Sequence, residues 1–197
     1  MIKMPILKLA MSVKVGGKIV YDMPLGLSHS WTRNAQMLWN RLADPADEIT
    51  NFGEGYFTVK STSGYAGSVY RNECNWTGTV NNHTYGIVIG TGTDAESYEG
   101  YALATQIETG TGAGQMEYQA MANATNEWDS DEITTTHSRY FNNNSGGAIT
   151  VNEVGVYATA GGMGTYMLCR DKLASGVEVP DTGQLYVTYA VTFELSP

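Results

Sequence analysis

The chemistry that the sequence first suggests is phosphate binding, at a glycine-rich segment near the middle of the chain. An apolar run leads into Gly90-Thr91-Gly92-Thr93-Asp94-Ala95, the spacing of a dinucleotide-binding fingerprint with alanine in the third glycine position. That fingerprint works only where parallel strands alternate with helices, and a helix begins directly after the loop. The flanking segments predict strands next to strands. We therefore interpret the glycines as a turn out of a β-sheet and expect no nucleotide or other cofactor there.

Other residues that could do chemistry do not form a recognisable set. The sequence lacks the motifs of serine hydrolases, zinc proteases and P-loop proteins, and His29, His83 and His137 lie in distant segments. The acidic stretch 127–132 offers oxygen ligands but not the spacing or internal glycine of a calcium loop, so we expect a solvated loop and no metal. A carboxylate pair from distant strands, as in glycosidases, stays open. Our reading is that the protein is not an enzyme.

Aromatic residues suggest a different kind of site. Sugars stack on exposed aromatic rings, and the sequence offers Trp76, Tyr98, Tyr101 and Trp128 as possible glycan contacts. Aromatic residues are equally common in β cores and protein interfaces. A glycan-binding or receptor-binding module is therefore an alternative function, and a glycan-degrading enzyme is a more distant one.

The composition limits the classes of partner. The 197 residues are 42% hydrophobic but only 16% charged, with 23 glycines and a formal net charge of −9. Such a surface repels nucleic-acid phosphates and anionic lipids, and the few basic residues are scattered. No apolar run reaches the roughly 18 residues of a membrane span. We expect neither nucleic-acid binding nor membrane insertion.

The first residues predict a strand rather than a signal peptide. Lys8 interrupts the apolar run of the N-terminus, and no small-residue cleavage site follows. Apolar residues alternate with polar ones from Leu7 to Val15, and Gly16-Gly17 then precedes a second strand-like run. Residues 7–23 therefore predict a hairpin, in a protein that stays inside a cell or leaves it by a non-secretory route.

One segment predicts an amphipathic helix, at about residues 31–42. Ser30 is a suitable N-cap, and Pro45 would end the helix. The expected apolar stripe, which would pack on a sheet or on a neighbouring subunit, consists of Trp31, Ala35, Leu38, Trp39 and Leu42.

The remainder predicts short antiparallel strands separated by turns. The last run alternates from Leu185 to Leu195, and the turn residues of 180–183 precede it. We expect a single domain over residues 1–197 that is mainly β, an antiparallel β-sandwich of jelly-roll or Ig-like type with one principal helix near the N-terminus. Cys74 and Cys169 are expected to be free buried thiols, with a disulfide as the alternative.

Three segments together resemble virion structural proteins of tailed bacteriophages. They are "SHSWTRNAQMLWN", "GIVIGTGTDAESYEGYALATQI" and "FNNNSGGAITVNEVGVYA" with the later "MLCRDKL" and "VPDTGQLYVTYAVTF". The resemblance covers about residues 28–195, departs most over 110–140, and rests on structural rather than chemical motifs. It implies a tail-associated, fibre-base or capsid-surface protein without catalytic residues.

Composition and resemblance give one functional expectation. We expect a non-enzymatic virion component that forms homo-oligomers, docks on other tail or capsid proteins, assembles in the host cytoplasm and then persists outside the cell. Residues 1–23 would form a hairpin used in assembly, and deleting residues 1–15 should weaken assembly more than folding. The candidate interface side chains are Leu7, Leu9, Met11, Trp31 and Trp39.

Overall fold

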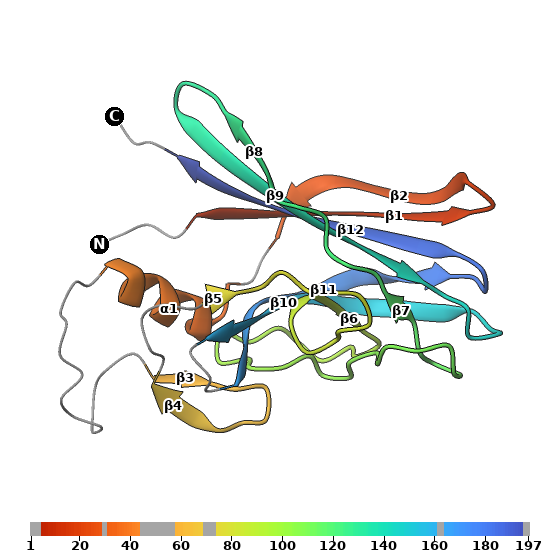
Figure 1. Cartoon of the computed structure of the whole chain (residues 1–197), viewed down its shortest axis with the longest axis horizontal. Helices are drawn as coiled ribbons and strands as arrows, with labels where there is room; N and C mark the ends of the chain where they lie inside the picture. Colours follow the sequence, from red (N-terminus) through yellow and green to blue (C-terminus); the bar gives the residue numbers. More distant parts are fainter. Residues whose placement is uncertain (1–4, 29–30, 44–57, 69–73, 161–163, 195–197) are drawn as a thin grey trace.

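The computed structural model of the chain describes residues 5–28, 31–43, 58–68, 74–160 and 164–194 (Figure 1). Within them lie twelve strands and one helix, and every strand pairing is antiparallel. The expectation of a mainly β, antiparallel protein with one helix is therefore confirmed.

The strands form three sheets. A six-stranded sheet has the order β2 (Lys18–Leu27), β1 (Ile6–Val15), β12 (Gln184–Glu194), β9 (Glu132–Asn142) and β7 (Glu117–Tyr118), with β8 (Thr125–Trp128) also paired to β9. A four-stranded sheet has β11 (Thr165–Val179) beside β10 (Ile149–Ala160), which also pairs with β5 (Cys74–Asn75) and β6 (Gly86–Gly90). The two-stranded sheet consists of β3 (Thr58–Lys60) and β4 (Ala66–Ser68).

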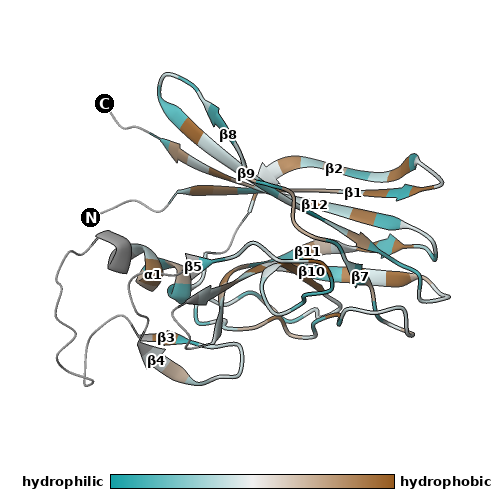
Figure 2. Cartoon of the chain, viewed as in Figure 1, coloured by the Kyte–Doolittle hydropathy of each residue, from teal (hydrophilic) through white to brown (hydrophobic). Residues whose placement is uncertain are grey.

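The two larger sheets lie in separate layers, with the six-stranded sheet uppermost in Figure 1. Inward side chains of both layers belong to one core cluster, which includes Met11 of β1, Val187 of β12, Ile87 of β6 and Val156 of β10. Apolar and polar residues follow each other along the strands of the upper sheet in Figure 2. This alternation is what a sheet with one buried face requires.

The predicted N-terminal hairpin is present. Gly16 and Gly17 have φ angles of 56° and 79°, so both central residues of the two-residue turn are in the left-handed region that matches the twist of the flanking strands. Along β1, Leu7 and Val13 mark the alternating face that is buried. β1 also pairs along most of its length with β12, so the first and last strands of the sheet are direct neighbours.

The helix α1 (Arg33–Ala43) begins two residues later than predicted and follows the first hairpin, so it is not the N-terminal element. Ala35 and Leu38 are buried, and the Trp39 ring lies 5.1 Å from the ring of Phe193 on β12. The apolar stripe therefore packs inside the chain. The predicted cap Ser30, the stop at Pro45 and the side chain of Leu42 lie outside the described residues.

Candidate functional site

The glycine-rich loop that resembles a nucleotide site is bound by a carboxylate of the chain itself. Glu153 of β10 is fully buried and accepts hydrogen bonds from the backbone N–H groups of Gly92 (3.1 Å), Ala104 (3.0 Å) and Thr105 (2.8 Å). The Nε of Arg170 donates a fourth, at 2.7 Å. Backbone amides that could cradle a phosphate thus already have an internal anion.

The same pair explains why the loop needs glycine. A Cβ atom at Gly90 would lie 2.5 Å from the Glu153 carboxylate, and one at Gly92 would also clash with it. Arg170 completes the arrangement by donating to the carbonyls of Asp94 (2.9 Å) and Ala95 (3.1 Å). The glycines therefore permit close approach to a side chain of the neighbouring strand.

A second buried cation organises the opposite end of β6. Arg139 of β9 is fully buried and lies 4.8 Å from the centre of the Tyr118 ring. Burial lowers the pKa of Arg139 to about 10, which still leaves it charged at neutral pH. Its guanidinium donates to five backbone carbonyls, those of Thr79, Asn82, Tyr85, Ile87 and Gln119. This side chain holds the loop before β6 against the six-stranded sheet.

A third polar cluster joins the two sheets. The carboxylate of Asp171 on β11 accepts hydrogen bonds from the Ser28 hydroxyl (2.8 Å) and from the Tyr189 hydroxyl on β12 (2.7 Å). Burial raises the pKa values of Tyr189 and of the Cys169 thiol well above their usual range, so both stay protonated and unreactive. Cys169 is a free buried thiol, as expected, and the side chain of Cys74 lies outside the described part.

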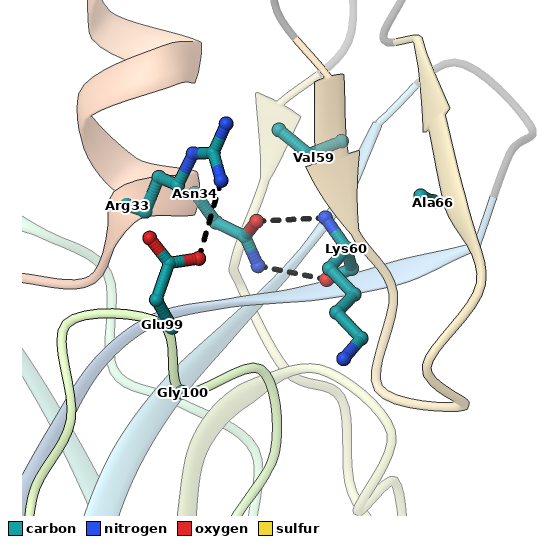
Figure 3. A pocket seen from close by; sticks show the side chains of 7 residues that line it. All are labelled: Arg33, Asn34, Val59, Lys60, Ala66, Glu99 and Gly100. Carbon is teal, nitrogen blue, oxygen red and sulfur yellow. Dashed lines mark hydrogen bonds and ion pairs between the residues drawn. The ribbon is translucent and has the colours of Figure 1, made fainter.

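A pocket of about 110 Å³ opens beside the start of α1 (Figure 3). The Asn34 side chain fixes one wall, because it accepts from the Lys60 N–H and donates to the Lys60 carbonyl, each at 2.8 Å. At the rim, Arg33 and Glu99 form an exposed ion pair at 3.2 Å. The lining residues are Arg33, Asn34, Val59, Lys60, Ala66, Glu99 and Gly100.

Two of the four predicted glycan contacts flank this pocket. Tyr98, half exposed, donates its hydroxyl hydrogen bond to Gln36 of α1, and its carbonyl accepts from the N–H of Arg33. Tyr101 lies beneath the Lys60 ammonium, which is 3.8 Å from the centre of its ring. The pocket lining therefore carries both signs of charge, and the two tyrosines lie beside it.

The other two predicted glycan contacts lie elsewhere. Trp76 is partly buried, with its ring 4.4 Å from the ring of His137, whose pKa is lowered by burial. Trp128 is 75% exposed at the end of β8. It belongs to the acidic stretch 127–132, which forms the exposed tip of the β8–β9 hairpin. The structure thus does not gather the four aromatics into one surface.

The described residues were also searched for metal-binding groups and for membrane-spanning helices. No group of three or more His, Cys, Asp or Glu side chains among them is placed to hold a metal ion. In that same part of the chain, no helix combines the length and the apolar character that crossing a bilayer demands.

Three of the five residues proposed from sequence as an assembly interface belong to the chain's own interior, and the two tryptophans are half-buried. Leu7, Leu9 and Met11 are 3%, 5% and 2% exposed, which makes them core residues. Trp31 donates its indole N–H to the Pro5 carbonyl (2.7 Å), and Trp39 packs on β12. Deleting residues 1–15 was expected to weaken assembly more than folding. This expectation needs the same correction, since the deletion would remove β1, an internal strand of the six-stranded sheet.

The exposed side of the hairpin is its other strand, β2. Sequence reasoning gave the hairpin of residues 1–23 a role in assembly and placed three of the five interface side chains on β1, but it named no apolar side chain of the second run. The signal was the contrast between a first strand that alternates and a second that mixes apolar residues with Pro24 and Gly26, as an edge strand can. The large apolar side chains of β2 that remain exposed are Ile19 (58%), Val20 (58%), Leu25 (49%) and Leu27 (67%).

The buried charges were also missed. Glu153, Arg139 and Arg170 each interrupt an otherwise strand-like sequence, and this interruption was the available signal. Comparisons with protein-family models, with curated proteins and with solved structures found no match for the chain. Arguments about function therefore rest on the geometry of the chain and on the sequence resemblance.

Proposed function

We propose that the chain is a non-enzymatic structural component of a phage virion, which forms homo-oligomers and docks on the tail or capsid. The observation that carries this proposal is the exposed edge of β2, where four large apolar side chains lie in water. Long, apolar edge strands invite pairing with another chain, and contiguous exposed apolar surface marks interaction sites. The phage setting comes from the sequence resemblance.

The interior supports a structural role. Glu153 and Arg170 bind each other and the glycine-rich loop, and Arg139 binds backbone carbonyls. Asp171 binds Ser28 and Tyr189. Each of these buried charges therefore serves the closure of the fold.

In finer terms, we propose that residues 1–197 form a single β-sandwich domain of jelly-roll or Ig-like type. The support is that two antiparallel sheets share one core cluster, and that β1 and β12, from the two ends of the described chain, pair side by side within the six-stranded sheet. Sandwiches of this kind give compact building units that present loops at their ends and sheet edges at their sides.

The test is to locate the protein in particles. Phage induced from a strain that carries the gene is purified on a density gradient and analysed by mass spectrometry and by immunogold electron microscopy. We expect stoichiometric amounts of the protein and a fixed label position on the tail or capsid. Purified infectious particles that lack the protein would overturn the proposal.

A specific observation favours a second candidate, a glycan-binding or receptor-binding module. The pocket of about 110 Å³ beside α1 is lined by the Arg33–Glu99 pair and by Lys60, and Tyr98 and Tyr101 lie next to this lining. Aromatic faces and bidentate charged groups are the usual means of holding sugars. On a glycan array, Tyr98→Ala should lose binding, and Trp128→Ala, at an exposed aromatic on the β8–β9 hairpin, should retain it. Equal binding by both variants, or none by the parent protein, would remove this candidate.

A further inference from the structure

The two larger sheets differ in how their outer strands are covered. The outer edge of β11 is covered along its first residues. The backbone of Trp31 forms a β-bridge with that of Cys169, the Thr32 N–H donates to the Leu168 carbonyl (2.8 Å) and the Thr62 N–H donates to the Thr165 carbonyl (2.8 Å). Within the described residues, no such segment pairs with the outer edge of β2. Its four exposed apolar side chains lie along this open edge.

The part of β2 that can accept another strand is bounded on both sides. The Gly16-Gly17 turn precedes it, and Pro24, which has no N–H, limits it at the other end. This leaves Lys18–Met23 as the free segment, whose midpoint falls between Val20 and Tyr21. A β-bulge lies at the same point, since the register passes from Lys14↔Ile19 to Val13↔Tyr21 and leaves Val20 without a partner on β1.

The backbone of this segment favours one pairing register. In an antiparallel ladder, alternate residues direct their N–H and C=O groups to opposite neighbours. A two-residue hairpin turn closes on the hydrogen-bonded pair Val15–Lys18, so Ile19 directs its groups away from β1. After the bulge this alternation of backbone direction resumes, and Asp22, like Ile19, directs its N–H and C=O groups away from β1. The open edge thus presents two sets of free groups, at Ile19 and at Asp22.

We propose that β2 pairs antiparallel with β2 of a second copy about a two-fold axis between Val20 and Tyr21. Ile19 then faces Asp22 of the second copy, and the two-fold symmetry repeats this pair. The free backbone N–H and C=O groups of both residues are thereby hydrogen-bonded between the two copies. The pairing also brings opposite charges together, because Lys14 lies beside Ile19 on the neighbouring strand. Its long side chain can reach across about 10 Å, two strand spacings, to Asp22 of the other copy. Asp22 of its own chain, which pairs with Ser12, lies at the diagonal position about 7–8 Å away, so in the dimer each Lys14 lies between two Asp22 carboxylates.

The size of the contact predicts a weak dimer in solution. A stable interface commonly buries about 800 Å² per partner, and a six-residue strand pair with its apolar side chains offers less than this. We expect a dissociation constant of roughly 10 to 100 μM. This inference rests on the proposed homo-oligomer, whose copies would be held at high local concentration on a particle, where weak contacts suffice.

The experiment measures the dimer and its register. In sedimentation equilibrium, Asp22→Lys places two lysines together at each symmetry-related site and should weaken the dimer by about tenfold or more. The exchanged variant Lys14→Asp/Asp22→Lys should return it to within about threefold of the parent. In parallel, a short bis-maleimide should join Val20→Cys copies into dimers and leave Val80→Cys, which is 56% exposed against 58% for Val20, unjoined.

Three results would overturn the inference. They are a parent protein that stays monomeric at several times the expected dissociation constant, an exchanged variant no better than Asp22→Lys, and a Val20→Cys variant that the bis-maleimide joins no more than Val80→Cys. The search for the protein in purified phage particles tests a different claim, the virion assignment. A monomer found on particles contradicts only this pairing, whereas a β2-paired dimer absent from particles contradicts only the virion assignment.

Discussion

Backbone polar groups in the interior beneath the glycine-rich loop are hydrogen-bonded by buried charged side chains, whereas those along the outer edge of β2 face water. In the interior, where loops rather than strands approach the sheets, Glu153 accepts from three amides and Arg139 donates to five carbonyls. At β2, one side of a ten-residue strand and four large apolar side chains face water. The chain thus closes its internal loops with its own charges and leaves the outer edge of β2 unpaired within the described residues.

The comparison predicts that changes in the interior act on folding, and the largest effect is expected at Arg139. Arg139→Met keeps much of the volume but leaves five buried carbonyls without their donor, so we expect a loss of about 3–5 kcal/mol in the free energy of unfolding. Urea denaturation measures it. The matched control is Arg33→Met, at an exposed arginine, which should cost under about 0.5 kcal/mol. Similar losses in both variants would contradict the structural role given to Arg139.

The second prediction concerns the buried ion pair. Glu153→Gln removes the charge that neutralises Arg170 and should cost about 2–4 kcal/mol, because a buried cation is left unpaired. Glu99→Gln, in the exposed pair with Arg33, should cost about 0.5 kcal/mol or less. Adding Arg170→Met to Glu153→Gln should destabilise by less than the sum of the two single changes. Additive losses in this double-mutant cycle would show that the two side chains act independently.

The third prediction is a pH dependence. Burial lowers the pKa of His137 in the folded protein below its ordinary value near 6.5, so the unfolded chain binds the proton more tightly. The contribution of His137 to stability is therefore complete above pH 6.5 and is lost as the pH falls from 6.5 towards the folded-state pKa. His137→Gln should flatten the fall in melting temperature between pH 7 and pH 5. Parallel profiles for the two proteins would exclude this contribution.

The smallest effect on stability is expected at the open edge. Ile19→Thr should change the free energy of unfolding by less than about 0.5 kcal/mol, since the side chain is already in water. The matched change Val13→Thr, on the buried face of the same hairpin, should cost about 1–3 kcal/mol because it buries a hydroxyl. A cost above 1 kcal/mol for Ile19→Thr would mean that this edge is already covered within the chain.

Much of the fold is predictable because strand patterns are local. The alternation from Leu7 to Val15, the Gly16-Gly17 turn and the alternating last strand each depend on neighbouring residues, and the structure contains them all. The helix differs by two residues at its start, where Thr32 hydrogen-bonds to β11 instead of joining the helix.

The site could not be predicted in the same way, because it depends on distant pairings. Alternation shows that one face of β1 is buried, but only its pairing with β12 makes β1 central and β2 the edge. Likewise, nothing near Glu153 in the sequence indicates that the amides of Gly92 and Thr105 meet it. Local patterns thus predict elements, whereas edges and buried charges are consequences of topology.

The pairing of β1 with β12 also sets an order of events during synthesis. β2 can form its hairpin with β1 as soon as both have left the ribosome, but β1 gains its other neighbour only after residues 184–194 have been made. Until then, both edges of the nascent hairpin are open and its apolar face is uncovered, the condition in which chains aggregate. Completion of the six-stranded sheet therefore has to wait until β12 has been made.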